Sequence, residues 1–325
     1  MHHTRRAMIA GLAAAPLLPS LVRAAEAGVP PPDLERRVAV KGGSLYVRVN
    51  GDLASGKPPL LLVHGGPGGA LWQFFPALPL ASDRAIILYD QLDSGRSDAP
   101  GDPANWTVER YVSEIDAVRM ALGVEDLHLL GHSWGGILAT RYAAALPKGL
   151  HSLILQGTPL SAASAKADIE RLLDALPDGA GATIRKHEAA GTLEDPAYGE
   201  AMMLFVRKHL NRTSVRALAM PYMEATPPDR GDALAMAITG GSLTQGFGGV
   251  LKGFDDTPLL PRITAPTLVL DGEFDIVTPA TAKAHAAALK RGTFEELKGA
   301  GHMAQFDQPD AWRTSVQRFI AARDV

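Results

Sequence analysis

Five short runs of apolar residues, each without polar alternation, constrain the fold of this chain most strongly. Strands of this kind are buried on both faces, which is typical of parallel sheets. Helical patterns separate the runs, as in 108–123, where apolar residues from Val108 to Met120 are expected largely on one side. An α/β fold is therefore predicted, with a mostly parallel central sheet and helices on both faces. The runs are PPLLLV at 58–63, AIILYD at 85–90, LHLLGH at 127–132, LILQG at 153–157 and TLVLDG at 267–272.

Two segments depart from this strand and helix alternation. Residues 36–51 alternate apolar and polar residues around a Gly-Gly pair, which predicts a β-hairpin. Between 158 and 260, helical patterns follow one another with no buried strand between them. We expect this block to be a helical cap inserted between two parts of one core, 25–157 and 261–325.

Composition narrows the classes of partner. With 32 basic and 35 acidic residues, the formal net charge is -3, so no basic excess is available to hold nucleic acid or an anionic membrane. The chain has no cysteine, which removes disulfides, thiolate metal ligands and a cysteine nucleophile. No metal and no organic cofactor are expected, and His209 is one of several histidines assigned surface or structural positions. The expected partner is a small molecule or short peptide, and the oligomeric state stays open.

The N-terminus has the pattern of an export signal. Arg5 and Arg6 precede an apolar stretch from Met8 to Val22, and Val22-Arg23-Ala24 resembles a cleavage site before Ala25. The stretch is shorter than the ~20 apolar residues of a membrane span, so stable membrane insertion is not expected. Residues 1–24 are predicted to be a twin-arginine-type signal of a bacterial periplasmic or secreted protein. The alternative is an N-terminal tail on a cytoplasmic protein.

The pentapeptide GHSWG at 131–135 places Ser133 between a buried strand and a predicted helix. This Gly-x-Ser-x-Gly pattern exposes a serine at a tight strand-to-helix corner, where it can act as a nucleophile. Serine needs a base and an orienting acid. Asp275 follows a buried strand and His302 lies in a later glycine-rich loop, so the order is serine, acid, histidine. Asp271 and Glu273 are alternative acids, and Ser133 and His302 could also be simple turn and loop residues.

The segment HGGPGG at 64–69 follows another buried strand and could stabilise an oxyanion. An oxyanion requires preorganised donors, and glycines allow backbone N–H groups to turn toward a bound carbonyl. We assign the backbone N–H groups of Gly66 and Trp134 as these donors. His64 is expected to hold the loop through a hydrogen bond.

Several blocks of the chain together resemble a known family. HGGPGG, YDQLDSGRSD at 89–98, GHSWGG, GEFDIVTP at 272–279 and GAGHMAQFDQP at 299–309 occur in the order found in the proline iminopeptidase branch of the α/β hydrolases. The resemblance runs from about Val38 to the C-terminus and includes the predicted cap. It implies an α/β-hydrolase fold, with Ser133, Asp275 and His302 in the catalytic roles and Gly66 and Trp134 at the oxyanion.

The chain departs from that family in its cap. The resemblance implies cap glutamates that bind the free ammonium of the substrate, but Leu243 stands where one such carboxylate would be. An ammonium entering a partly closed pocket costs several kcal/mol without a counter-charge. Glu224 is a possible substitute, and Leu243 and Phe247 are further candidate substrate-binding residues. Leu92-Asp93 also replaces the more usual Arg-Gly of the family.

Three hypotheses for function follow. The first is a serine hydrolase that cleaves small amide or peptide bonds through an acyl-enzyme, as a proline iminopeptidase-like aminopeptidase or amino acid amidase. The second is an esterase, lactonase or amidase acting on substrates without an ammonium group, because of Leu243. The third is a non-catalytic binding protein on a hydrolase scaffold. The complete set of serine, acid and histidine argues against this third hypothesis.

Overall fold

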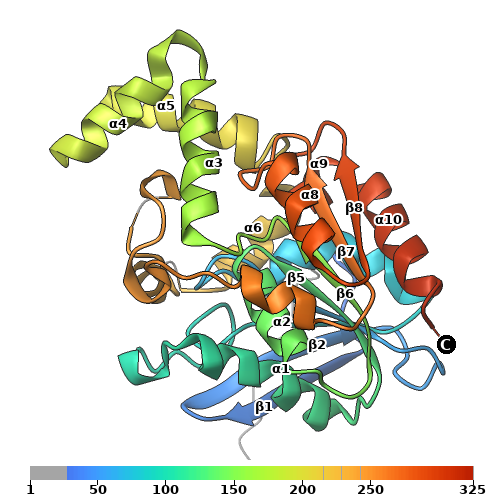
Figure 1. Ribbon diagram of the computed structural model, residues 1–325. Helices are drawn as coiled ribbons and strands as arrows, with labels where there is room; N and C mark the ends of the chain where they lie inside the picture. The colour runs from blue at the N-terminus through green and yellow to red at the C-terminus, as the bar shows by residue number, and fades with distance from the viewer. Residues whose placement is uncertain (1–27, 215, 228, 242, 325) are drawn as a thin grey trace, which may run out of the picture.

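An eight-stranded sheet forms the centre of the molecule in the computed structural model, which describes residues 28–214, 216–227, 229–241 and 243–324 (Figure 1). The strand order is β1-β2-β4-β3-β5-β6-β7-β8. β1 pairs antiparallel with β2, and β2 with β4, whereas all later pairs are parallel. The predicted hairpin and mostly parallel sheet are confirmed. The strands are β1 Leu34–Val40, β2 Gly43–Asn50, β3 Leu60–Val63, β4 Ile86–Tyr89, β5 Leu127–His132, β6 Leu150–Gln156, β7 Thr267–Gly272 and β8 Gly292–Leu297.

The apolar runs form strands because both faces of the sheet are covered. In β3, Leu61 and Val63 face one core, whereas Leu60 and Leu62 face the other. Since side chains alternate across a strand, a strand covered on both sides needs apolar residues at every position. The first face carries α1 Val108–Leu122, α2 Trp134–Ala144 and α8 Pro279–Ala288; the second carries η1 Leu71–Ser82, α9 Ala304–Asp307 and α10 Pro309–Ala321.

Helix α1 lies where its apolar pattern predicts. The side chain of Thr107 caps its start by accepting a hydrogen bond from the Arg110 N–H, and Gly123 ends it in the left-handed conformation. Val108, Tyr111, Ile115 and Val118 are buried and Val112 is partly buried, but the expectation for Met120 is wrong, because its side chain is 75% exposed. Two residues after Val118 in a helix correspond to a rotation of about 200°, which turns Met120 to solvent.

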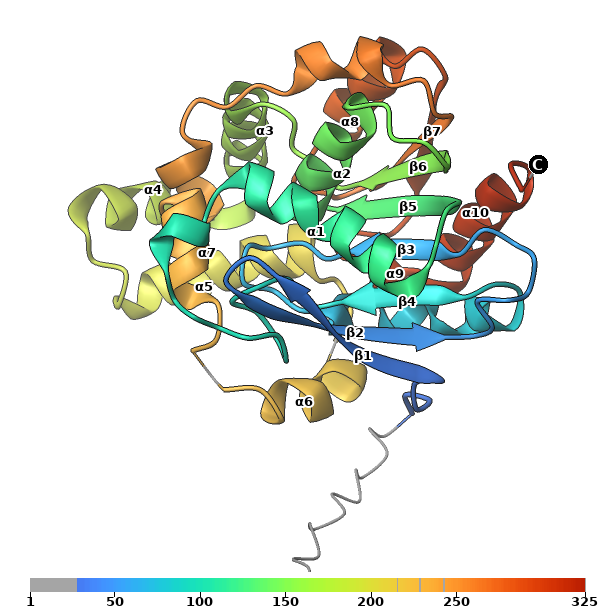
Figure 2. The same cartoon turned by 90° about the horizontal axis from the view of Figure 1, so that it is seen from below.

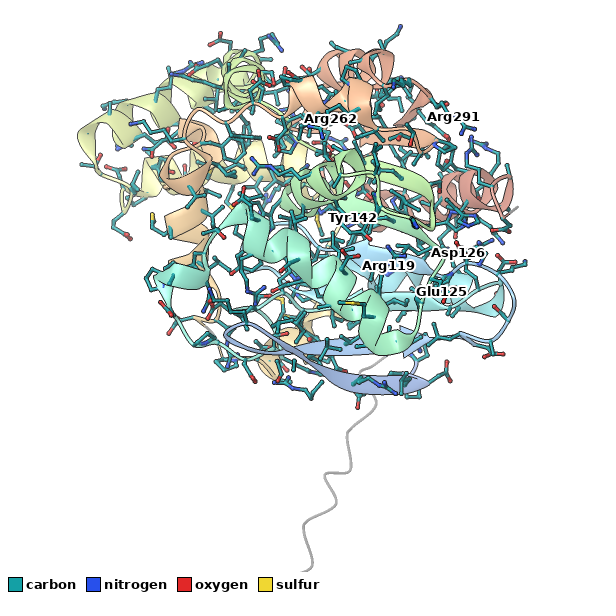
Figure 3. All side chains as sticks on the ribbon, turned by 60° about the horizontal axis from the view of Figure 1, so that its bottom comes forward. Arg119, Glu125, Asp126, Tyr142, Arg262 and Arg291 are labelled. Carbon is teal, nitrogen blue, oxygen red and sulfur yellow. The ribbon has the colours of Figure 1, made fainter. Side chains whose placement is uncertain are left out.

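Helices α1 and α2 are also fastened at the edge of the molecule by one arginine. Figure 3 shows Arg119 of α1 beside Tyr142 of α2 and near Glu125. The Arg119 guanidinium donates hydrogen bonds to the Tyr142 hydroxyl and to the carbonyls of Glu125 and Lys148. This cluster fixes α2, the helix that begins beside Ser133, against the sheet.

The stretch between β6 and β7 is helical and contains no named strand among its described residues. Its entry and exit lie side by side, because Ala162 N–H donates to Phe254 O (2.9 Å) and Asp256 N–H donates to Leu160 O (2.7 Å). Figure 2 shows these helices beyond the ends toward which β4 and β5 point, that is, over the carboxyl edge of the sheet. We propose 158–260 as the cap. Its helices are α3 Ala162–Asp174, α4 Ala180–Ala190, α5 Pro196–Phe205, α6 Arg216–Glu224 and α7 Asp232–Thr239, with short turns η3 Pro177–Gly179, η4 Val206–Leu210, η5 Leu243–Gln245, η6 Gly249–Leu251 and η7 Thr257–Arg262; η2 Pro103–Asn105 precedes α1.

The predicted export signal, 1–24, lies outside the described residues. Within the described part of the chain, no helix combines the length and apolarity that crossing a bilayer requires.

Candidate active site

Ser133 occupies the corner between β5 and α2. Its backbone has φ 54° and ψ -120°, a conformation that costs a non-glycine residue free energy and that is found mostly at functional sites. A hydrogen bond from Ser133 N–H to Gln156 O (2.8 Å) holds this backbone to β6. The serine side chain thus projects from a rigid corner at the N-terminus of a helix, where the helix dipole favours negative charge.

The glycines around Ser133 are required by close packing. A Cβ atom at Gly135 would lie 2.1 Å from Val63 O, and one at Gly131 would lie 2.4 Å from Gly135 O. Neither carbonyl can move away, because each belongs to the backbone of an element in the core. The spacing of the motif is therefore a steric requirement of a helix that starts directly against the sheet.

Asp275 and His302 are in contact. His302 Nδ1 is 2.8 Å from Asp275 Oδ1, and the same oxygen accepts a hydrogen bond from Val277 N–H at 2.9 Å. Both side chains are buried, and Asp275 lies in the loop after β7. Because a carboxylate can only accept, Nδ1 carries the proton and Nε2 is left with its lone pair free to take one.

The two alternative acids bind elsewhere. Asp271 Oδ1 accepts a hydrogen bond from Gly157 N–H (2.8 Å), and burial together with the charge of Asp275 raises its pKa well above the ordinary value. Glu273 Oε2 accepts from Gly299 N–H at 3.0 Å, in a partly buried position. Of the three candidate acids, only Asp275 contacts His302 in the described part of the chain.

The serine and histidine loops meet at the end of β6. Gly157 follows this strand, and a Cβ atom there would lie 2.8 Å from both Asp275 Oδ2 and His302 Nδ1. His132, the neighbour of Ser133, lies 3.1 Å from His302 O through its Nε2. No hydrogen bond joins the Ser133 hydroxyl to His302 among the described residues. Such bonds are often long before substrate binds.

The HGGPGG loop lies beside this corner, since a Cβ atom at Gly65 would approach the Ser133 Cβ to 2.9 Å. Gln73 clamps it by accepting from Gly65 N–H (2.9 Å) and donating to Gly65 O (3.1 Å). His64 Nε2 accepts from Gln91 N–H, so Nδ1 carries the proton and donates to Gly65 O at 3.1 Å. Burial lowers the pKa of His64 to about 4. His64 is a neutral brace, and its predicted hydrogen bond to the loop is confirmed.

The two residues expected to supply the oxyanion donors are Gly66 and Trp134. Gly66 has φ 58°, and Trp134 is the first residue of α2, so its N–H has no acceptor within the helix. The Trp134 side chain is anchored away from the corner, with Nε1 donating to Gln91 Oε1 at 2.8 Å. Both residues line the same cavity as Ser133.

That cavity, about 250 Å³ in volume, lies between the sheet edge and the cap. Leu243 and Phe247 line it, whereas Glu224 does not and is exposed at the end of α6. No residue among those that line it carries a charged side chain. The described residues contain no group of three or more His, Cys, Asp or Glu that could hold a metal ion. The cap side of the cavity includes Ala165, Ile169, Ala235, Thr239, Leu243 and Phe247.

Sequence reasoning missed Gln73, Gln91 and His209. The two glutamines connect His64, the glycine loop and Trp134, and His209 binds the loops of Asp275 and His302 from the cap. Gln91 lies in YDQLDSGRSD, one of the blocks that resemble the family, and this location was the one sequence signal that could have marked it as a site residue. Nothing local marks the other two.

Comparisons with known proteins show which family this chain belongs to. The family model described as alpha/beta hydrolase fold matches residues 58–309. The chain is 33% identical to a proline iminopeptidase of Heyndrickxia coagulans, over 83% of this chain and 92% of that protein. It is 35% identical to one of Levilactobacillus brevis, over 86% of this chain and 93% of that protein.

A solved structure of a proline iminopeptidase is also similar to this chain in three dimensions. The crystal structure of proline iminopeptidase from Mycobacterium smegmatis superposes with a TM-score of 0.82 and 31% identity, covering 90% of this chain and 99% of that one. These relatives share about a third of their residues with this chain over most of its length, so the relation includes the sequence as well as the fold. The chain therefore belongs to the α/β-hydrolase family, in its proline iminopeptidase-like branch, and is a hydrolase of the serine type.

Proposed function

We propose that this protein hydrolyses small amides or esters through an acyl-enzyme formed on Ser133. His302 removes the serine proton through Nε2 as the hydroxyl attacks the carbonyl carbon, and Asp275 orients the imidazole and stabilises its charged form. His302 then donates that proton to the leaving group, and water releases the acyl group by the same steps in reverse order. The observation that carries this proposal is the 2.8 Å contact between His302 and Asp275 beside the strained Ser133 corner.

The negative charge of the tetrahedral intermediate needs donors that are already in place. The N–H groups of Gly66 and Trp134 are proposed for this role. Their support is positional: both residues line the cavity with Ser133, and Gln73 and His64 hold the glycine loop rigid.

Covalent labelling tests the mechanism. We expect a fluorophosphonate to add once per chain and to abolish hydrolysis, and peptide mapping to place the adduct on Ser133. Ser133→Ala should not be labelled. Labelling at another residue, or hydrolysis by Ser133→Ala at the wild-type rate, would contradict the proposal and leave a non-catalytic role for Ser133.

The first candidate for the substrate is the N-terminal residue of a peptide or an amino acid amide. The named relatives are proline iminopeptidases, which supports an aminopeptidase or amidase of that kind. In this reading a cap carboxylate such as Glu224 would have to meet the substrate ammonium, and Glu224 would have to move toward the cavity to do so.

The second candidate is an acyl group without an ammonium, and the cavity favours it. An ammonium in this cavity would meet Leu243, Phe247 and Ile169 but no carboxylate among the lining residues. Leaving such a charge unpaired costs several kcal/mol. An uncharged acyl group larger than benzene would fit, since a cavity of about 150 Å³ holds a benzene ring.

A paired assay separates the two candidates. Prolyl and alanyl 4-nitroanilides are compared with their N-acetylated counterparts and with uncharged 4-nitrophenyl esters, with Ser133→Ala as background. A higher kcat/KM for the free amines supports the aminopeptidase; a higher value for blocked or uncharged compounds supports an esterase, lactonase or amidase.

We also propose that the protein is exported through the twin-arginine route to the periplasm or beyond. The support is the sequence of residues 1–24 alone. Fractionation of a bacterium that expresses the full chain should place the wild type outside the cytoplasm, and the double variant Arg5→Lys, Arg6→Lys inside it. Equal distribution of both would contradict the proposal.

A further inference from the structure

One short turn of the cap, η4 (Val206–Leu210), binds both loops that carry the proposed acid and base. The turn is π-helical, a wide form that is frequent at functional sites. It closes with a hydrogen bond from Asn211 N–H to Val206 O at 3.1 Å. The carbonyls of His209 and Leu210 lie at its end and are free to accept from other segments.

The backbone of η4 holds the histidine loop. His302 N–H donates to His209 O at 2.8 Å, and Met303 N–H donates to Leu210 O at 2.9 Å. The approach is so close that a Cβ atom at Gly301 would lie 2.8 Å from His209 O. The position of the His302 backbone is therefore set by the cap as well as by the core.

The side chain of His209 holds the acid loop. Its Nδ1 lies 2.8 Å from Phe274 O, and because a carbonyl only accepts, Nδ1 must carry a proton and donate. Phe274 O and Asp275 N belong to one planar peptide group, so this hydrogen bond fixes the plane from which the Asp275 side chain projects. The other nitrogen, Nε2, is buried without a hydrogen-bond partner among the described residues.

We propose that His209 is a positioning residue that sets the distance and orientation of Asp275 relative to His302 from the cap. Its carbonyl fixes the base and its imidazole fixes the acid, so seating of the cap and alignment of the acid and base are one event. The inference rests on the proposed roles of Ser133, Asp275 and His302. The His209 ring also packs against the Phe205 ring, with 5.1 Å between the ring centroids. If His209 served only for packing, the ring would be sufficient and the Nδ1 proton would not be needed.

Three substitutions separate positioning from packing. His209→Asn places an amide nitrogen near the position of Nδ1, so it keeps the donor to Phe274 O. His209→Gln places its nitrogen near the position of Nε2 and loses that donor, and His209→Phe keeps the ring but has no donor. The matched control is His187→Phe, because His187 is also a buried cap histidine with a hydrogen bond from Nδ1. His187 lies in α4, and its Nδ1 is 2.8 Å from the hydroxyl of Thr192 in the turn that follows this helix.

The readouts are kcat, KM, the rate of fluorophosphonate labelling and the thermal midpoint. We expect His209→Phe and His209→Gln to lower kcat and the labelling rate about tenfold or more, because small misplacement of catalytic groups has effects of this size. Their KM should stay within about twofold, since His209 does not line the cavity. His209→Asn should keep most of the activity, and His187→Phe should change the thermal midpoint only.

The inference is overturned if His209→Gln and His209→Asn have equal kcat and labelling rates, or if His187→Phe reduces them as much. The Asn and Gln pair decides the matter if His209→Phe does not fold. Ser133→Ala is measured in parallel: if it remains active, the proposed catalytic serine has failed, whereas an inactive Ser133→Ala with a fully active His209→Gln means that only the role of His209 has failed.

Discussion

The two sides of the cavity are built differently. The floor is formed by the Ser133 corner, the HGGPGG loop and the residues that follow Asp275, and hydrogen bonds or backbone packing hold these segments in place. The roof consists of the cap residues that line the cavity, and it contributes mainly apolar side chains such as Ile169 and Phe247. Under the proposed mechanism, the chemistry and the choice of substrate therefore depend on separate parts of this molecule.

Several large apolar side chains of the cap are exposed. Leu243, which lines the cavity, is 42% exposed, and Met236 and Val250, elsewhere in the cap, are exposed to a greater extent. Exposed side chains with few partners can be exchanged at small cost in stability. Substitutions in the floor should therefore affect turnover or folding, and substitutions in the roof should affect preference.

The largest effect is expected at the floor, for Ser133→Ala. Removing the proposed nucleophile should lower kcat by about 10⁴-fold or more, because the proposed base and acid then have no hydroxyl to activate. The free energy of unfolding should change little, since alanine fits the same corner. Activity assays with urea unfolding check both, and a large loss of stability would contradict the separation of chemistry from folding at this position.

Gly135→Ala should damage the floor through packing. The new Cβ atom would lie 2.1 Å from Val63 O, so α2 has to shift from the sheet. We expect a loss of about 3 kcal/mol or more in the free energy of unfolding, the upper range for overpacking. Urea unfolding of the soluble variant measures it, and a stability equal to the wild type would mean that the corner is looser than its contacts indicate.

Acid should weaken the floor through His64. Its pKa is lowered to about 4 by burial, so below the ordinary value of 6.5 the unfolded chain binds a proton that the folded chain does not. Stability from this group is present at pH 7 and is lost as the pH falls from about 6.5 to about 4, by about 3 kcal/mol.

The variant His64→Asn removes this contribution while keeping a donor near Gly65 O. Its stability deficit relative to wild type, measured by urea unfolding, should shrink as the pH falls through that window and stay constant between pH 7 and 8. A deficit that does not vary with pH would show that His64 titrates normally. Asp90 and Glu114, whose pKa values burial raises to about 6 and about 7, act in the opposite direction but are common to both proteins.

Leu243→Glu should change the preference of the roof. A carboxylate at this position would face the cavity and could pair with a substrate ammonium. The ratio of kcat/KM for free over N-acetylated amino acid anilides should rise about tenfold, the equivalent of about 1.4 kcal/mol of selective pairing. Leu243→Gln is the matched uncharged control, and an equal rise in that variant would attribute the change to polarity rather than charge.

The smallest effect is expected for Gly199→Ala in α5. No atom lies within 4 Å of the added Cβ, and the backbone is helical. The variant should gain about 0.5–1 kcal/mol, since glycine costs that much in a helix. Thermal unfolding measures the gain, and a loss of stability comparable to Gly135→Ala would remove the contrast between this cap glycine and the glycine of the floor.

The elements of the core could be predicted from local pattern, and the choice among nearby acids could not. The sequence places Asp271, Glu273 and Asp275 within five residues of one another, Asp271 near the end of a strand and the other two just after it. Only the fold shows that Asp275 reaches His302, while the other two bind Gly157 and Gly299. Their separation arises from where β7 ends and how the next loop turns.

Features that depend on neighbours in the chain can be predicted from the sequence alone. Fully apolar runs specify strands covered on both faces, and glycines on either side of Ser133 specify a corner that only small residues can form. Both follow from burial and steric exclusion within a few residues.

The distant groups that complete the site are brought together only by the fold. His209 lies 65 residues from Phe274 and 93 from His302 in the chain, yet it binds both, and the uncharged cavity exists only where cap and sheet meet. Hydrogen bonds and cavities of this kind depend on where separate elements are packed. The periodicity of a single sequence indicates which face of an element is buried, but it does not indicate which other element covers that face.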